Sequence, residues 1–370
     1  MGNVPNLRFP EFSGEWEKTR LGDNCNIQMC KRIMAVQTNT DGGVPFYKIG
    51  TIGGKADAYI SKDLFDEYKA KYSFPHKGEV MITCAGTVGK CIIYNGEDSY
   101  YQDSNIVWID NPKEIISNDF LYHLLSKINW SHLNSTTIVR IYNDDLRNLK
   151  LYYPIHDEQK KITNFLSLIN KRIATQNKII EDLKKLKSAI TDLLLHSIAD
   201  AHTIRLGEIA HITNGVGDVQ DANTEHQEDW YPFFDRSEEL KWFPTYSFDK
   251  EAVIYAGEGQ SFYPRYYNGK FALHQRCYAI TDFASCIIPK YCYHFMNTLN
   301  SYFVRNSVGS TVPSLRMDIF QKVEIRLPPI PKQQYICKII DAFYTKLEVE
   351  QRGISTLQEL KQFLLSQIFI

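Results

Sequence analysis

The sequence lacks the features that would place it in a membrane or outside the cell. No run of 18 apolar residues occurs, so the sequence excludes a membrane-spanning helix. The eight cysteines include no C-x-x-C pair, and the first ten residues hold no apolar stretch of the secretory kind. We therefore expect a cytoplasmic protein whose thiols are reduced and mostly buried.

The sequence also has no excess of one charge. It contains 42 Lys and Arg and 43 Asp and Glu, so the formal net charge is -1. At first sight this balance argues against nucleic-acid binding.

Catalytic motifs are missing as well. The segment Ala85–Cys91 is the nearest approach to a phosphate loop, but Cys84 stands in place of the first glycine and Cys91 in place of the Ser or Thr. Gly215-Val216-Gly217 lacks the third glycine of a dinucleotide fingerprint. The ten histidines are scattered, with no pair at metal-ligand spacing. The sequence thus predicts a binding protein with no metal site and no catalytic site.

What the sequence does contain is an internal repeat. At 370 residues the chain is long enough for two or three domains. A constant offset of 174 aligns the segment after Tyr153-Pro154-Ile155 with the segment after Leu327-Pro328-Pro329. Near the start of each half, Arg20-Leu21-Gly22-Asp23 matches Arg205-Leu206-Gly207-Glu208 at an offset of 185. The repeat predicts a duplicated order of domain, helix, domain, helix. Further matches at the offset of 174 pair Ile162 with Ile336, Phe165 with Ile339, and Thr136-Thr137-Ile138 with Ser310-Thr311-Val312.

Each predicted helix carries an apolar stripe whose steps alternate between four and three residues. A 3.5-residue period over about four heptads is typical of a coiled coil. Each helix leaves its own domain and leads toward the other, so we expect the two to pair antiparallel, with pseudo-twofold symmetry. The alternative is that each helix packs on its own domain. The predicted core of the helix pair is Ile169, Ile173, Ile180, Leu183, Ile190 and Leu194 with Phe343, Leu347, Ile354, Leu357, Leu364 and Ile368.

The two globular heads resemble each other in pattern, and the predicted class is α+β. Short aromatic and β-branched runs alternate with turn signals, and a helix is expected near residues 119–129 and 289–300. The pairs Asn95-Gly96 and Asn268-Gly269 predict matching hairpin turns. The predicted domains are two β-rich heads at 1–154 and 201–328 and two spacer helices at 155–200 and 329–370.

Charge is unevenly distributed within the second head. Residues 218–258 contain eleven acidic and three basic residues, whereas residues 259–317 contain six basic residues against Asp282 alone. Aromatic and amide side chains lie between the basic residues, as in Gln260–Tyr267 and Leu273–Arg276. Arg and Lys neutralise phosphates, while Arg, Asn and Gln can read base edges. The alternative for such segments is a core of aromatics beneath a solvated charged face.

Several motifs along nearly the whole chain resemble one known family. They are Leu7-Arg8-Phe9-Pro10 with Trp16-Glu17 and Leu21-Gly22-Asp23, the Gly86–Lys90 hairpin, and the helix start at Tyr153–Ile162. With the duplication, they resemble the specificity (S) subunit of type I restriction–modification systems, the HsdS family. The resemblance implies that each head is a target-recognition domain for one half of a split site in double-stranded DNA, and that the paired helices set the distance between the heads.

The resemblance also implies partners and a division of labour. Two methyltransferase subunits would dock on the helices, and restriction/translocase subunits would complete the assembly. The subunit itself would be non-catalytic and without a cofactor, with S-adenosylmethionine, ATP and Mg on the partner subunits. The second head departs from the first, because Gly257-Glu258-Gly259-Gln260 stands where the first has Thr87-Val88-Gly89-Lys90. We therefore expect an asymmetric site with two different half-sites.

The residues expected to contact DNA are basic, amide, hydroxyl and aromatic side chains of both heads. Two other readings remain: a non-catalytic adaptor with two β-heads that bind protein, and a self-contained modification enzyme. The predicted DNA-binding residues are Lys48, Thr51, Lys90, Gln102, Asn105 and Arg140 in the first head, and Gln260, Arg265, Tyr266, His274, Gln275, Arg276, Thr311 and Arg316 in the second.

Overall fold

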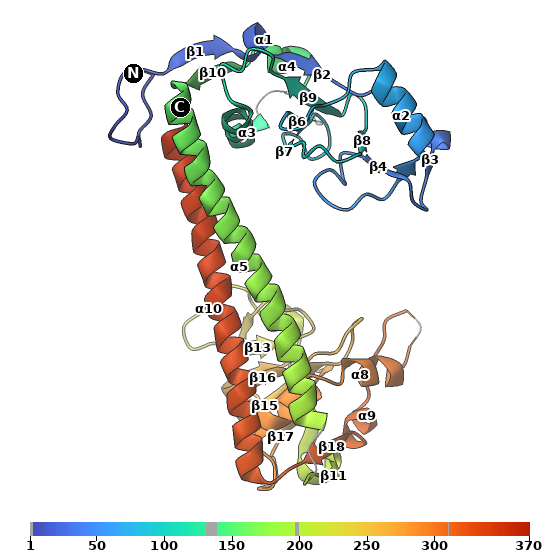
Figure 1. The fold of residues 1–370 in the computed structure, drawn as a ribbon. Helices are drawn as coiled ribbons and strands as arrows, with labels where there is room; N and C mark the ends of the chain where they lie inside the picture. Colours follow the sequence, from blue (N-terminus) through green and yellow to red (C-terminus); the bar gives the residue numbers. More distant parts are fainter. Residues whose placement is uncertain (1–2, 131–138, 197–199, 310) are drawn as a thin grey trace. The chain divides into compact units, whose positions relative to one another are not determined.

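The computed structural model describes residues 3–130, 139–196, 200–309 and 311–370. The chain divides into two compact units, one formed by residues 1–176 with 353–370 and the other by residues 177–352. Both long helices, α5 (His156–His196) and α10 (Ile330–Ile368), contribute to each unit, because the division falls inside them (Figure 1). The expected helices are thus present, with 41 and 39 residues.

The first unit is a mixed α+β structure. Its described strands form one sheet in the order β2-β9-β6-β7, a second in the order β3-β5-β4-β8, and an antiparallel ribbon of β1 with β10. The strands are β1 (Glu17–Arg20), β2 (Asn26–Gln28), β3 (Thr38–Asn39), β4 (Val44–Tyr47), β5 (Tyr59–Ile60), β6 (Val80–Thr83), β7 (Cys91–Ile93), β8 (Tyr100–Tyr101), β9 (Ile106–Asp110) and β10 (Lys150–Tyr153). The short helices are α1 (Leu21–Asn24), α2 (Lys62–Lys71), α3 (Asn118–Lys127), α4 (Asn143–Arg147) and the 3-10 helix η1 (Ala35–Gln37).

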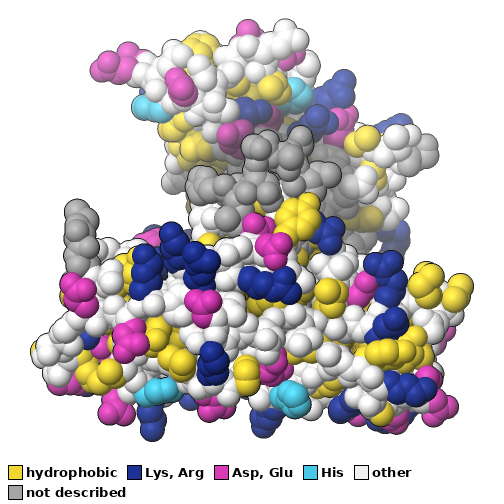
Figure 2. Space-filling model, turned by 90° about the horizontal axis from the view of Figure 1, so that it is seen from above, with side chains coloured by type: hydrophobic (Ala, Val, Ile, Leu, Met, Phe, Trp, Pro, Cys, Tyr) yellow, Lys and Arg dark blue, Asp and Glu magenta, His cyan; other side chains and the backbone are white. Residues whose placement is uncertain are grey.

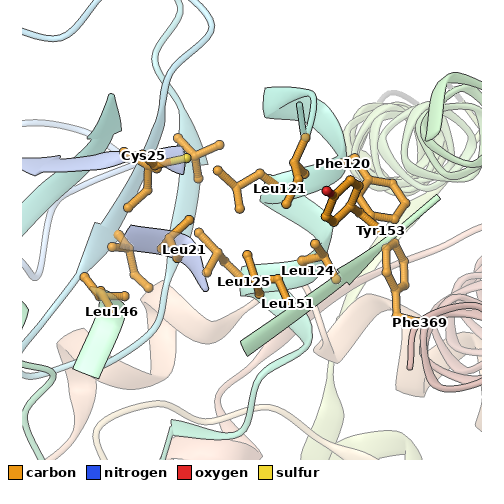
Figure 3. Packing of buried hydrophobic residues seen from close by; sticks show 14 of the residues in the cluster. Leu21, Cys25, Phe120, Leu121, Leu124, Leu125, Leu146, Leu151, Tyr153 and Phe369 are labelled. Atoms are coloured by element: carbon orange, nitrogen blue, oxygen red, sulfur yellow. The ribbon is translucent and has the colours of Figure 1, made fainter. Parts of the chain in front are cut away.

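The sheet β2-β9-β6-β7 separates two hydrophobic cores, because successive strand residues face opposite sides. On β6, Val80 and Ile82 belong to the core beneath α3, whereas Met81 belongs to the core shared with α2. The α3 core also takes in Leu364 and Phe369 at the end of α10, and Figure 3 shows Phe369 beside Phe120 of α3. The head is therefore joined to helix α10 through apolar packing.

The second unit repeats this plan with a larger sheet. The described strands follow the order β12-β17-β15-β16-β13-β14, and β11 pairs with β18 in an antiparallel ribbon. The strands are β11 (His202–Arg205), β12 (His211–Asn214), β13 (Tyr231–Phe234), β14 (Lys241–Phe243), β15 (Phe248–Ala256), β16 (Arg265–Leu273), β17 (Cys277–Thr281) and β18 (Glu324–Leu327). The helices are α6 (Leu206–Ile209), η3 (Val219–Asp221), α7 (Pro289–Met296), α8 (Asn300–Asn306) and α9 (Met317–Gln321).

Each unit contains a hydrogen bond that matches one in the other unit, as the duplication predicts. The Leu21 N–H donates to the Leu149 carbonyl at 2.9 Å, and the Leu206 N–H donates to the Val323 carbonyl at 2.8 Å. Both bonds close the ribbon at the same place, where the first short helix of each head begins. The fold of the two heads thus derives from one pattern. The match of residues 136–138 with 310–312 involves residues 136–138 and 310, which lie outside the described part of the chain.

The predicted stripe is the more buried side of both long helices. All twelve of its residues are buried or half-buried, whereas exposed side chains fill most positions between them. In the first unit, Ile162 and Leu166 near the start of α5 share a core with Leu364 and Ile368 near the end of α10. In the second unit, Leu195 shares a core with residues from the start of α10, namely Ile336, Cys337 and Ile340.

The predicted turns need correction. Asn268-Gly269 lies inside β16, where Gly269 faces Lys250 of β15, so it forms no hairpin turn. Gly269 has a φ of 130°, a backbone conformation that favours glycine. At Asn95-Gly96 the chain bends and the Glu97 N–H donates to the Asn95 side-chain oxygen at 3.0 Å, but the flanking strands β7 and β8 belong to different sheets, so this pair forms no hairpin turn either.

Candidate nucleic-acid interface

Several loops of the first unit come together where β4, β6 and β8 end. The Gln102 N–H donates to the Tyr47 carbonyl at 2.9 Å, and the Cys84 N–H donates to the Asn105 carbonyl at 2.7 Å. The Cys84 carbonyl in turn accepts the Ile141 N–H at 2.9 Å. Backbone bonds therefore hold the loops together independently of their side chains. We call the segments 48–54, 84–90, 102–105 and 139–142 the first loop cluster.

Lys90 is placed in this cluster by a tight glycine turn. Gly86 and Gly89 have φ values of 65° and 83°, and a Cβ on Gly89 would lie 2.0 Å from the Trp130 ring. The turn brings the Lys90 ammonium to within 2.5 Å of the Ile52 carbonyl, across the 48–54 loop. The resemblance to a phosphate loop is thus superficial, because these glycines serve a close packing contact.

Lys48 and Thr51 shape the neighbouring loop. The Thr51 hydroxyl accepts the Lys48 N–H at 3.0 Å, and the Lys48 ammonium forms an ion pair with Asp57 at 3.0 Å. Because both side chains of this ion pair are largely exposed, the pair contributes little to stability and can open toward a ligand.

The remaining predicted residues of the first head also lie in the cluster. The Arg140 guanidinium donates to the Ser104 carbonyl at 3.3 Å and lies over the Tyr142 ring. Gln102 and Asn105 occupy the same 102–105 loop and are half-buried. The structure thus brings all six predicted residues of the first head into one region, with three cations and two amides.

The second unit builds an equivalent cluster with the same backbone bonds. The His274 N–H donates to the Phe234 carbonyl at 2.9 Å, as Gln102 does to Tyr47. The Leu315 N–H donates to the Gly257 carbonyl at 2.7 Å, as Ile141 does to Cys84. We call the segments 235–237, 257–260, 274–276 and 311–316 the second loop cluster.

An arginine and a carboxylate meet at the centre of the second loop cluster. Arg276 and Glu258 form an ion pair at 2.9 Å, with 67% of the Arg276 side chain exposed. Both residues, together with His274 and Gln275, line a depression of about 540 Å³. Gln260, Thr311 and Arg316 are exposed on the adjoining segments. Six of the eight residues predicted for the second head thus lie on or beside one concave surface.

Arg265 supports this surface from behind. Its guanidinium donates to the backbone carbonyls of Asp235 and Ser237 and lies beside the Phe234 ring. Burial alone would raise the pKa of Asp235, but hydrogen bonds from Lys241 and Ser237 hold that pKa below its usual value. The half-buried Arg265 therefore holds a loop in place.

Tyr266 does not lie with the other predicted residues. Its hydroxyl bonds Glu251, and its ring packs against Tyr293 of α7. Burial, followed by the bond to Glu251, raises the pKa of this phenol. The side-chain alternation of β16 places Tyr266 on the face opposite Arg265, which explains why adjacent residues separate.

Charges of both signs are interspersed on the visible surface. Figure 2 shows Lys and Arg side chains among Asp and Glu, without one large basic patch on the face drawn. Charges of both signs also meet at the two loop clusters. Asp57 neutralises Lys48 of the first cluster, and Glu258 neutralises Arg276 of the second.

Comparison with known proteins identifies the family. The model for the type I restriction modification DNA specificity domain matches the chain twice, at residues 13–185 and 199–359. The chain belongs to this family. The double match agrees with the internal repeat and covers most of the 370 residues.

Curated members of the specificity family show sequence similarity over part of their length. The chain is 48% identical over 163 residues to a provisionally named type I restriction enzyme specificity subunit, S.HindORF215P, of Haemophilus influenzae. The aligned part is 44% of this chain and 42% of the relative. The chain is 30% identical over 165 residues to the EcoDI specificity subunit of Escherichia coli, which covers 44% of this chain and 36% of that one. The chain therefore matches less than half the length of each of these two relatives.

A solved specificity subunit shares the fold. The crystal structure of the type I restriction–modification S subunit from M. genitalium aligns over 99% of both chains with a TM-score of 0.63 and 16% identity. The expected resemblance and the expected mixed α+β fold are confirmed at this level. The relatives are specificity subunits, and the expectation that this chain is not itself an enzyme agrees with them.

No metal centre or spanning helix accompanies the specificity domains in the described part of the chain. Within it, no group of three or more His, Cys, Asp or Glu residues could hold a metal ion. Likewise, no described helix is long and apolar enough to cross a membrane. All eight cysteines are free, as expected, and burial raises the pKa of the Cys84 thiol to about 12.

Sequence reasoning missed the acidic partner of the second loop cluster. Glu258 lies in the Gly257–Gln260 segment that replaces the glycine turn of the first head, but its contact with Arg276 is across 18 residues. It also missed Arg32, which forms an ion pair at 2.8 Å with Asp103 of the 102–105 loop. Neither pairing has a local sequence signal.

Proposed function

We propose that this chain is the non-catalytic specificity subunit of a type I restriction–modification complex, which reads a bipartite, asymmetric site in double-stranded DNA. One loop cluster would read each half-site. The observation that carries the proposal is that equivalent backbone bonds hold both loop clusters, although their side chains differ. A conserved frame with different contact residues is what two different half-sites require.

The chemistry of the loop clusters suits the major groove. Lys48, Lys90 and Arg140 can neutralise phosphates, while Asn105 offers an amide that can pair with an adenine edge. In the second cluster, Arg276 offers a guanidinium for guanine, and Glu258 offers an acceptor for the cytosine amine. The two clusters therefore favour different base pairs, and the site is asymmetric.

The long helices would act as the spacer. We infer that α5 and α10 pair antiparallel as a coiled coil with pseudo-twofold symmetry, because the start of each helix packs with the end of the other. Half-sites read from one side of a duplex are separated by about 34 Å or a multiple. Helices of 41 and 39 residues can span such a distance.

The outer face of the helices would receive the methyltransferase subunits. Leu186 and Leu360 occupy matching positions of the repeat and are 49% and 45% exposed. Equivalent exposed leucines suit two copies of one partner. In this arrangement the methyltransferase subunits carry S-adenosylmethionine, and the restriction/translocase subunits carry ATP and Mg, all in the cytoplasm with the DNA.

Methylome sequencing of cells that carry this chain with its methyltransferase partner tests the proposal. We expect a bipartite, asymmetric, adenine-methylated motif that disappears when this chain is deleted. An unchanged methylome after deletion would contradict the proposal. A protein-binding adaptor or a self-contained enzyme would be recognised by the absence of the motif or by methyl transfer without partners.

A further inference from the structure

A buried glutamine joins the first head to the start of its long helix. Gln159, in the first turn of α5, is 1% exposed. Its amide oxygen accepts the Ser117 N–H at 2.8 Å, and its amide nitrogen donates to the Ile115 and Pro154 carbonyls at 3.0 and 2.9 Å. Because Ser117 is the N-cap of α3, this one side chain connects α3, the end of the β-ribbon and α5.

The second head contains the same joint. Gln333, in the first turn of α10, is 0% exposed. Its amide oxygen accepts the Ile288 N–H at 2.8 Å, and its nitrogen donates to the Cys286 and Pro328 carbonyls, each at 2.8 Å. Ile288 is the N-cap of α7, the counterpart of α3. All three hydrogen bonds of one glutamine are therefore repeated by the other.

The glutamine joint restricts the angle between the head and its long helix, in addition to holding the two in contact. Apolar packing is non-directional, whereas hydrogen bonds favour a narrow range of distance and angle. Each glutamine uses both amide hydrogens and its carbonyl on backbone groups of three separate segments. Rotation of the head about the helix start would break at least one of these bonds in a buried place.

Other polar contacts near the two joints have diverged. In the first unit Arg8 forms a buried ion pair with Glu158 at 2.7 Å, whereas Lys332 occupies the position matching Glu158 in the second. In the second unit His294 bonds Asp341 of α10 at 3.0 Å, but Ser167 occupies the matching position in α5. The glutamine joint is retained in both copies while its surroundings differ, so both heads share a requirement for this geometry.

We propose that Gln159 and Gln333 are positioning residues that fix the angle between each head and its helix, and thereby the number of base pairs accepted between the two half-sites. This inference rests on the proposed function. Adding one base pair moves a half-site by about 3.4 Å and turns it by about a tenth of a helical turn. A rigid joint rejects such a change, and a loosened joint tolerates it.

The experiment measures methylation by the assembled complex on duplexes that carry the two half-sites at the natural spacing and at one base pair more or less. The wild-type complex should prefer the natural spacing by at least about tenfold. The Gln159→Met variant keeps the side-chain length but removes the hydrogen bonds, and we expect this preference to fall to about threefold or less. Gln333→Met should have the same effect from the other head.

A matched control separates positioning from general stability. Phe65→Leu alters a buried residue of the α2 core, away from the joint, and should lower the melting temperature without changing the spacing preference. If Gln159→Met does not fold, Gln159→Asn, which shortens the side chain by one methylene, provides the same test. An unchanged spacing preference in folded glutamine variants would overturn the inference. A wild-type complex that recognises no bipartite site would instead overturn the proposed function.

Discussion

At the scale of single residues, Arg276 is an exposed cation of the second loop cluster, with 67% of its side chain accessible. If its guanidinium reads a guanine, Arg276→Ala should weaken binding to the specific site by about 1–3 kcal/mol, with a much smaller loss on unrelated DNA. Fluorescence anisotropy of the assembled complex on both duplexes measures the difference. Arg205→Ala removes an exposed arginine of β11, outside the loop cluster, and should leave specificity unchanged. Equal losses on both duplexes would assign Arg276 to phosphate contact instead.

Two buried histidines make the stability of the fold depend on pH. Burial lowers the pKa of His123 on α3 and of His294 on α7 to about 4, and the contact of His294 with Asp341 only partly offsets this effect. Between pH 6.5 and 4 the unfolded chain therefore binds more protons than the folded chain, so the free energy of unfolding decreases as the pH falls. From pH 7 to pH 4.5 we expect a loss of about 2–3 kcal/mol for each histidine.

Denaturant unfolding at pH 7 and pH 4.5 measures this loss. The double variant His123→Gln with His294→Gln should show a smaller difference between the two pH values than the wild type. An equal difference in both proteins would contradict the assignment and point to carboxylates as the origin of acid sensitivity.

The sequence predicted residue types better than residue contacts. The offset of 174 already paired Gln159 with Gln333, but nothing local indicated that their amides bond three backbone groups. Tyr266 was grouped with Arg265 because they are adjacent, and only the position of α7 shows which face of β16 is covered. Arg8 and Glu158 are 150 residues apart, and such a pair has no sequence signal.

At the scale of elements, the long helices have one buried and one exposed face. Leu364 of α10 is 7% exposed within the first core, whereas Leu360, one turn earlier, is 45% exposed. Leu364→Ala should therefore reduce the free energy of unfolding by about 2–5 kcal/mol. Leu360→Ala should change stability by less than about 0.5 kcal/mol but weaken co-purification of the methyltransferase subunits.

Thermal unfolding and affinity pull-down of the two variants provide the comparison. A loss of methyltransferase binding in Leu364→Ala at a temperature where it is folded, with none in Leu360→Ala, would exclude the outer face as the docking surface.

Helices were easier to predict than sheets for a physical reason. The 3.5-residue period of α5 and α10 is a local property, so the sequence alone located both helices to within a few residues. Strand pairing is non-local, and the parallel pairing of β4 with β8 joins residues more than 50 positions apart. The pair Asn268-Gly269 predicts a turn when only the local sequence is considered, but the nine-residue strand β15 pairs with β16 on both sides of it, so β16 continues through the pair.

At the scale of the whole molecule, the two repeats share the same backbone hydrogen bonds but differ in the side chains that their loop clusters expose. Equivalent bonds hold the ribbons, the loop clusters and the glutamine joints, while the segments that face solvent in the loop clusters differ in sequence and charge. On the proposed function, substitutions in one loop cluster should alter one half-site and leave the other unchanged, because the backbone bonds are made separately within each unit.

The net charge of -1 bears on the affinity of this chain for DNA and on the salt dependence of that affinity. Non-specific affinity comes mainly from phosphate neutralisation, and here Asp57, Glu258 and Asp103 already neutralise Lys48, Arg276 and Arg32. The isolated chain should accordingly bind duplex DNA weakly, with a shallow slope of log affinity against log salt. If the proposed methyltransferase subunits contribute positive charge at the DNA, the assembled complex should bind tightly with a steeper slope. Salt titrations of both species on the same duplex measure the two slopes, and tight, specific binding by the isolated chain would show that the loop clusters alone supply the necessary field.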